Sequence, residues 1–144
     1  MNESPIYSRT YDFVAWLLPQ AIKFPRAYRF TLAERVQRRA LDFQETLVAA
    51  GLERGNWRAV RLREADTQLA QLRQTLRLCQ ELGLLTLRQY EHAAERLAEI
   101  GRLLGGWQKK LEATGSADGA RRRVEQQSQE LPRRLPEQEP PDEL

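Results

Sequence analysis

The 144-residue chain has few of the side chains that build catalytic and metal sites. It holds one cysteine, one histidine and one methionine. Cys79 alone excludes an internal disulfide, and its place on an apolar helical stripe predicts a buried, unreactive thiol. His92 falls on an outward helical face beside Glu95 and Glu99, which is typical of a solvated histidine rather than a ligand or a base. Without a pair of histidines or cysteines, the sequence predicts no metal site and no cofactor.

Other signals of catalysis or membrane insertion are also missing. Gly105 and Gly106 lie inside a helical pattern with no strand before them, so they do not form a phosphate-binding loop. No nucleophile has a base at helical spacing, and we expect that the protein is not an enzyme. No apolar run approaches bilayer length, and the first residues lack the basic-then-apolar pattern of a signal peptide. We therefore expect a cytoplasmic protein.

Lysine is scarce, and arginine carries the positive charge, with 20 Arg against 3 Lys. The formal net charge of +3 is unevenly spread. Residues 1–113 hold 18 basic and 13 acidic side chains, a balance of +5, whereas residues 114–144 hold 5 and 7, a balance of −2. Guanidinium groups bind phosphate and carboxylate in bidentate fashion, so the first part is compatible with nucleic acid or an acidic protein partner.

Two stretches of helical periodicity, joined by a short turn, organise the chain. Apolar residues recur at three- and four-residue steps over residues 62–79 and again over 90–111. Between them, Gly83 suits a helix end because it adopts positive φ without a Cβ clash, and Thr86 with Gln89 forms a capping-box pattern. The pattern predicts an antiparallel hairpin that needs further helices to cover its apolar stripes.

Two more helices are predicted before this hairpin. The first covers about residues 8–23, and the second runs from about residue 25 or 26 to Ala50, closed by Gly51. Asn56 is placed to cap the third helix. Because the connections are short, the four helices predict an all-α, antiparallel up-down-up-down four-helix bundle.

The apolar periodicity ends near residue 113. The sequence beyond it is rich in Gly, Ser, Gln and Glu and is interrupted by four prolines: Pro132, Pro136, Pro140 and Pro141. This composition predicts a disordered tail over 114–144, after a bundle domain of 1–113.

Apolar residues on the outward faces of the first three helices exceed what a monomer of this size needs. These residues are Tyr11, Val14, Leu18, Ile22, Leu41, Val48, Leu78 and Leu82. They predict a homo-oligomer, in which a second copy covers them.

Arginines are the candidate binding residues: Arg26, Arg29, Arg35, Arg38, Arg73 and Arg77. In one interpretation they form ion pairs within a soluble surface, for instance Arg73 or Arg77 with Asp66 or Glu81. In the other they form a basic rim, repeated by oligomerisation, that contacts phosphates or an acidic protein. Arg39 lies at the centre of the second helix's apolar stripe, where we expect a paired interior or interface residue.

Several segments resemble one known family, the Avd proteins, which are accessory variability determinants of diversity-generating retroelements. The similar segments are Lys23–Arg35, Asp66 with Leu69, Leu76–Gly83, Tyr90–Ala94 and Ile100–Lys109. Together they cover about residues 8–112, and the Phe24-Pro25-Arg26 and Leu104-Gly105-Gly106-Trp107 pieces are the most specific. The C-terminal segment has no counterpart.

The resemblance implies both an assembly and a role. Avd proteins form homopentameric barrels of four-helix bundles, bind the element's reverse transcriptase, and contact template RNA or cDNA through basic surfaces. They support mutagenic retrohoming, in which error-prone cDNA from a template repeat replaces a variable repeat in a target gene. They have no catalytic activity of their own.

A second resemblance implies an alternative function. The predicted bundle is also similar to proteins encoded by intervening sequences in bacterial large-subunit ribosomal RNA genes. This alternative implies a structural or protein-interaction oligomer without a direct nucleic-acid role. The motifs of the hairpin fit the Avd family better.

Overall fold

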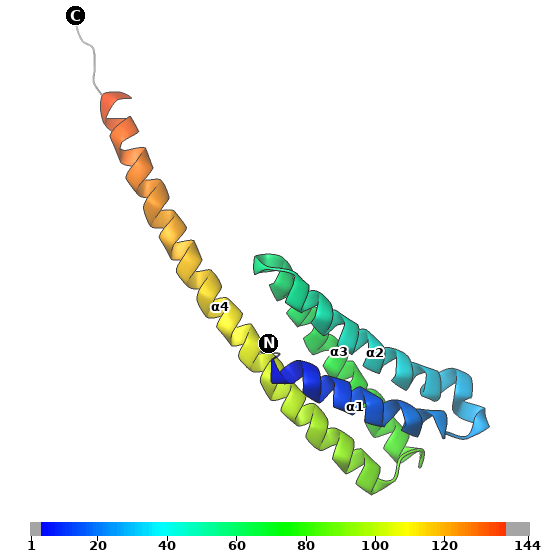
Figure 1. Ribbon diagram of the computed structural model, residues 1–144. Helices are drawn as coiled ribbons and strands as arrows, with labels where there is room; N and C mark the ends of the chain where they lie inside the picture. The colour runs from blue at the N-terminus through cyan, green and yellow to red at the C-terminus, as the bar shows by residue number, and fades with distance from the viewer. Residues whose placement is uncertain (1–3, 138–144) are drawn as a thin grey trace, which may run out of the picture. The chain divides into compact units, whose positions relative to one another are not determined.

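The computed structural model describes residues 4–137, with side-chain surroundings defined outside residues 116–118, 120 and 129–137. All regular structure in this part of the chain is helical (Figure 1), so the predicted all-α class is confirmed. The elements are α1 (Pro5–Ile22), the 3-10 turn η1 (Arg26–Tyr28), the π-helical turn η2 (Arg29–Ala33), α2 (Glu34–Leu52), α3 (Gly55–Glu81) and α4 (Leu87–Glu137). The chain divides into two compact units, residues 1–108 and 109–144.

The first unit has an apolar core to which α1, α2, α3 and α4 each contribute a stripe. In the predicted hairpin, the buried residues are Leu62, Ala65, Leu69, Leu72, Leu76 and Cys79 on α3, and Ala93, Leu97, Ile100 and Leu104 on α4. Fully burying a large apolar side chain contributes about 1.5–3 kcal/mol. The predicted periodicity of both arms is therefore confirmed, and burial rather than helix propensity supplies most of their stability.

Each of these helices contacts two others in the first unit. α2 lies against both α1 and α3. α1 also contacts α4, where Arg9 pairs with Glu99 at 3.0 Å. α3 contacts α4, where the Arg73 guanidinium donates to the Leu97 carbonyl at 3.1 Å. Residues far apart in the sequence are thereby brought side by side, as Figure 1 shows.

The turn between α3 and α4 is built as predicted. Gly83 has φ +76°, and its N–H donates to the Gln80 carbonyl at 3.0 Å. The Leu84 N–H donates to the Cys79 carbonyl at 2.8 Å, which completes a Schellman motif. On the other side, the Thr86 hydroxyl accepts from the Gln89 N–H at 3.1 Å, and the Gln89 side chain accepts from the Thr86 N–H at 2.9 Å. This reciprocal pair is the capping box.

The turn between α2 and α3 differs from the prediction at both of its ends. Gly51 does not close α2, which continues to Leu52. A Cβ at Gly51 would collide with the hydroxyl of Tyr7 from α1, so the glycine serves close packing rather than a helix end. Asn56 does not cap α3, because α3 begins at Gly55, whose φ of +57° makes the turn.

The segment before α2 is also more elaborate than the predicted continuous helix. After Pro25, the chain forms η1 and then η2, and regular α-helix begins only at Glu34. Tyr28 breaks the helix because its φ of −107° and ψ of 7° are not helical. A π-helical turn holds one residue more than an α turn. Within this turn, Ala33 is buried while Phe30 is 82% exposed.

The first helix starts earlier than predicted, at Pro5, because proline suits the first helical position, where its missing N–H is not needed. Val14 was predicted on an outward face, and this is wrong, since it is buried at 5% exposure. Of the other residues predicted there, Leu18 is half-buried, and six are exposed: Tyr11, Ile22, Leu41, Val48, Leu78 and Leu82.

The second unit begins at Lys109, and within it α4 continues to Glu137. Of the side chains whose surroundings are described in this unit, none is buried. A helix of this kind gains little from packing. The predicted boundary at 113–114 and the predicted disorder of 114–144 stay predictions. None of the helices within residues 4–137 combines the length and apolar character that a bilayer-crossing segment requires.

Candidate nucleic-acid and partner interface

The predicted binding arginines lie on four elements and are all exposed. Arg26 lies in η1, Arg29 in η2, Arg35 and Arg38 in α2, and Arg73 and Arg77 in α3. They separate into two groups, one leading into and along the start of α2 and the other on α3.

The first group leaves cationic charge available. Arg38 is bound to Glu34 one turn earlier, with distances of 2.6 and 3.0 Å, and this hydrogen bond to the carboxylate raises the pKa of the guanidinium. Among the described side chains, Arg26, Arg29 and Arg35 form no ion pair. This segment therefore offers three uncompensated guanidinium groups to an anionic partner.

Arg73 belongs to the packing of α3 against α4. Its guanidinium lies over Gly101 as it reaches the Leu97 carbonyl, and a Cβ at Gly101 would stand only 2.6 Å from its Nη2. Gly101 thus leaves the space that this contact needs. Arg73 has a structural role, which makes it a poor reporter of binding.

Arg77 forms the ion pair with Glu81 that one interpretation of the sequence predicted, at 3.4 Å. Both side chains are more than half exposed, at 64% and 59%. Such a surface pair contributes about 0.3–0.5 kcal/mol. Because Arg77 follows Arg73 by one helical turn, it lies toward the same side of α3.

The two groups of arginines lie at the same level of the fold. Arg39 donates to Gln71 at 2.8 Å and Thr46 donates to Glu64 at 3.4 Å, so α2 and α3 run antiparallel, with Arg35 level with Thr75. The Arg73 side chain instead turns toward α4. The structure therefore sets Arg73 apart from the arginines of α2.

Arg39 has the partner that its central position predicted. It is half-buried and bonded to Gln71, while its Nε is buried without a hydrogen-bond partner. Arg39 therefore links α2 to α3 with one of its donors unsatisfied, and an unsatisfied buried N–H costs free energy.

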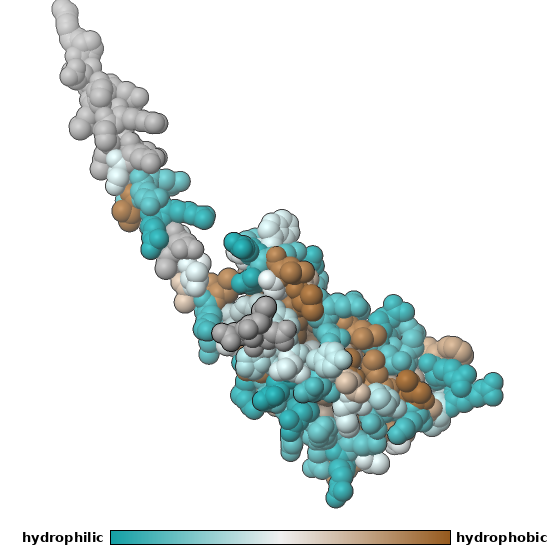
Figure 2. Space-filling view, viewed as in Figure 1, coloured by the Kyte–Doolittle hydropathy of each residue, from teal (hydrophilic) through white to brown (hydrophobic). Residues whose placement is uncertain are grey.

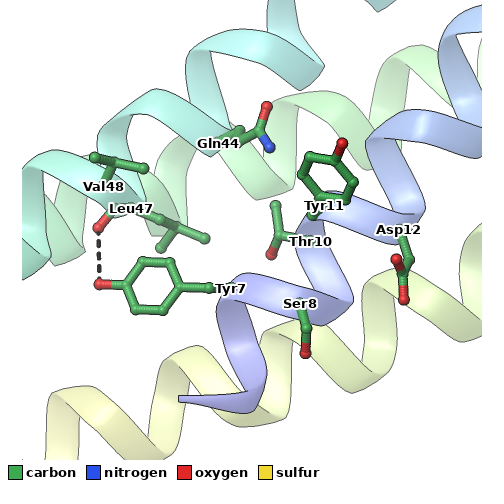
Figure 3. A pocket seen from close by; sticks show the side chains of 8 residues that line it. All are labelled: Tyr7, Ser8, Thr10, Tyr11, Asp12, Gln44, Leu47 and Val48. Carbon is green, nitrogen blue, oxygen red and sulfur yellow. Dashed lines mark hydrogen bonds between the residues drawn. The ribbon is translucent and has the colours of Figure 1, made fainter. Parts of the chain in front are cut away.

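A groove of about 400 Å³ lies between α1 and α2 (Figure 3). Tyr7 donates from its hydroxyl to the Leu47 carbonyl at 3.3 Å and forms one end of the groove. Burial raises the pKa of this hydroxyl, against an opposing effect of Arg58. Tyr11 and Val48 face the groove from opposite helices and are 65% and 49% exposed.

Hydrophobic surface extends from this groove along both helices. Ile22 on α1 and Leu41 on α2 are 69% and 38% exposed. Figure 2 shows hydrophobic residues running along this side of the molecule between hydrophilic ones. We call the exposed residues Tyr11, Ile22, Leu41 and Val48 the α1–α2 apolar face. All four were predicted to be outward-facing from their position opposite the core stripes.

Cys79 and His92, the residue types most often used in catalytic and metal sites, lie on different helices. Cys79 is fully buried, as predicted, and burial raises the pKa of its thiol to about 11. His92 is exposed, as predicted, and its ring packs at an angle against Trp16, with centroids 4.5 Å apart. Within the described residues, no group of three or more His, Cys, Asp and Glu side chains is placed to hold a metal ion.

One exposed aromatic residue was not among the predicted site residues. Trp57 lies at the start of α3 and is 70% exposed. Its distance of five residues from Leu62 places it off the buried stripe of α3, and this helical offset is the signal that identifies it.

The chain is similar to a known protein family. The model of the bAvd-like family matches residues 5–111. No curated protein matches the chain.

Proposed function

The chain belongs to the bAvd-like family, and we propose that it is a non-catalytic accessory protein of a diversity-generating retroelement. In this proposal, it binds the reverse transcriptase of the element together with template RNA or cDNA in the cytoplasm and supports mutagenic retrohoming. The family match covers about three-quarters of the chain and includes every stripe of the core.

The arginine-rich segment that leads into α2 carries the nucleic-acid part of the proposal. Arg26, Arg29 and Arg35 are exposed, lie within ten residues of one another, and form no ion pair among the described side chains. Exposed cations of this kind bind phosphates by releasing counterions, without regard to base sequence. Arg38 and Arg77 are held by carboxylates one turn away, and we assign them a secondary part.

An oligomer of four-helix bundles is the proposed form. The pairwise contacts of α1, α2, α3 and α4 support an up-down-up-down bundle. The α1–α2 apolar face supports association, because exposed apolar side chains of this number in one chain favour a covered surface. We propose that a homopentamer repeats the arginine segment five times around a ring.

The test is fluorescence anisotropy of a labelled structured RNA, titrated with the protein at several salt concentrations. The wild type should bind with an affinity that falls steeply with salt. The triple variant Arg26→Glu, Arg29→Glu, Arg35→Glu should reduce the slope of log K against log salt by about 2–3, since each lost phosphate contact removes about 0.7–0.9.

A matched control separates this surface from net charge. The triple variant Arg88→Glu, Arg96→Glu, Arg102→Glu changes the net charge equally on α4, where all three side chains are exposed. It should keep a slope closer to that of the wild type. An equal loss in both triple variants would overturn the assignment to the segment before α2, and no binding by the wild type at low salt would remove nucleic acid from the proposal.

A second candidate function is a structural or protein-interaction oligomer without a nucleic-acid role, and the α1–α2 apolar face favours it. The variant Leu41→Glu, Val48→Glu introduces charges at exposed positions and should dissociate the oligomer in light scattering coupled to size-exclusion chromatography. If RNA binding persists in the dissociated protein, oligomerisation and binding are separable. A reverse-transcriptase gene and near-identical repeats beside this gene would favour the first candidate.

A further inference from the structure

Trp57 lies at the turn between α2 and α3, and most of its side chain is exposed to solvent. The ring is 70% exposed, and among the described residues it forms no aromatic pair. The other tryptophans do form such pairs, Trp16 with Phe13 and His92, and Trp107 with Tyr7. A large exposed ring without an aromatic partner is available to a ligand.

The backbone that carries Trp57 is held on both sides. Arg58, the next residue, donates to the Ala50 carbonyl at 2.8 Å and to the Gly51 carbonyl at 3.1 Å. Its guanidinium also lies 5.8 Å from the centre of the Trp107 ring. Arg61, one turn after Trp57, is bound to Glu53 at 3.3 Å. The indole therefore stands on a pre-organised turn, which lowers the entropy lost on binding.

Charge surrounds the ring. A shallow hollow of about 530 Å³ in front of it is lined by Glu53, Arg54, Trp57 and Arg61. Arg61 is shared between the carboxylate of Glu53 and that of Glu64, the latter at 3.4 Å. Arg54 is exposed and forms no ion pair among the described side chains. The hollow thus combines an aromatic face with a guanidinium, that of Arg54, which no carboxylate holds.

We propose that Trp57 stacks on an unpaired base of single-stranded nucleic acid while Arg54 contacts a neighbouring phosphate. The inference rests on the proposed function and adds to it a second site, at the α2–α3 turn, that selects unpaired segments. Stacking of bases on aromatic side chains, next to cations that follow the backbone, is how single strands are bound without sequence preference. A protein partner is less well matched, because Leu52 is the only other exposed large apolar residue between 51 and 64.

The test compares two labelled RNA probes, an unstructured 12-nucleotide strand and a blunt duplex of the same length, by anisotropy at low salt. Trp57→Ala should weaken binding of the single strand by about 5- to 100-fold, the range expected for loss of one stacked base. It should change binding of the duplex less than twofold. Trp57→Phe should retain most of the affinity, because it keeps an aromatic face.

Two further variants identify the chemistry. Arg54→Gln should weaken the single strand and lower its salt slope by about 0.7, the value for one phosphate contact to a single strand. Leu52→Ala removes an exposed apolar side chain from the same turn and should leave both affinities unchanged. Circular dichroism melts should coincide for all four variants, since each replaced side chain is exposed.

The outcomes separate this inference from the proposed function. If the wild type binds both probes and Trp57→Ala matches it, the stacking site is overturned and the proposed function stands. If Leu52→Ala loses as much as Trp57→Ala, or if Trp57→Ala loses only binding to the reverse transcriptase, the turn is a protein contact and the inference is overturned. If the wild type binds neither probe, the nucleic-acid role itself fails.

Discussion

The turn between α3 and α4 and the turn between α2 and α3 end their helices by different means. The first is closed by its own residues, with Gly83 at positive φ and Thr86 and Gln89 capping each other. The second has no side-chain cap at the start of α3. At the end of α2, the carbonyls of Ala50 and Gly51 accept hydrogen bonds from the guanidinium of Arg58 on the next helix.

The comparison shows where a sequence motif suffices. A Schellman motif or a capping box depends on residues within six positions of one another, so local sequence encodes it. A carbonyl bonded by an arginine eight residues away depends on how two helices lie against each other. The first kind of turn should tolerate changes elsewhere in the fold, whereas the second should be sensitive to them.

Arg58→Ala should have the largest effect on stability, a loss of about 2–3 kcal/mol. The variant leaves two carbonyls without a charged donor, and hydrogen bonds to charged groups contribute about 1.5–3 kcal/mol. It also removes the contact with the Trp107 ring. Urea unfolding followed by circular dichroism measures the change. Arg58→Lys serves as the control, and a lysine that restored full stability would show that charge alone, without the planar fork, closes α2.

Gly51→Ala should cost about 1–3 kcal/mol, because the added methyl group collides with the Tyr7 hydroxyl and overpacks the contact of α1 with α2. Tyr7→Phe removes that hydroxyl and should restore part of the loss when the two changes are combined. Thermal unfolding of both single variants and of the double variant gives the coupling energy. Additive effects would mean that the glycine is not reserved for the tyrosine.

Gly83→Ala should cost about 1–2 kcal/mol, which is the penalty for placing a Cβ in the left-handed region. Nothing lies within 4 Å of a Cβ built at Gly83, so the effect should come from backbone strain alone. Gly83→Asn should cost less than Gly83→Ala in the same unfolding experiment, because asparagine tolerates this conformation. If alanine were neutral, the turn would have another conformation in solution.

Thr86→Ala should cost about 1 kcal/mol, the usual value for losing an N-terminal cap. Thr86→Ser keeps the hydroxyl and should restore most of it. Urea unfolding again provides the measurement. A loss for serine equal to that for alanine would indicate that the threonine methyl group, rather than the hydroxyl, supports the turn.

Arg77→Ala should have the smallest effect, about 0.3–0.5 kcal/mol, because its pair with Glu81 is exposed on both sides. It contrasts with Arg58, since both arginines lie near a helix end but only Arg58 bonds backbone carbonyls. The stability difference should disappear in high salt, which screens the pair. A salt-independent loss would assign Arg77 a packing role.

For the candidate binding residues, the sequence could indicate which residues are exposed but not which of them lie together in space. Exposure of all six arginines followed from their places outside the apolar stripes. That Arg73 crosses to the Leu97 carbonyl over Gly101 depends on the distance between α3 and α4. The exposure of Trp57 follows from its helical offset, since it lies off the buried stripe of α3.

The sequence by itself determined the core stripes, the α3–α4 turn, the buried Cys79 and the exposed α1–α2 apolar face. Each follows from helical periodicity or from contacts within a few residues. The tertiary structure alone decided where α2 begins and ends, the role of Gly51 beneath Tyr7, and the turn of Arg73 toward α4. These depend on side chains brought together from different helices, and helical periodicity specifies which face a residue occupies but not which residue lies opposite it.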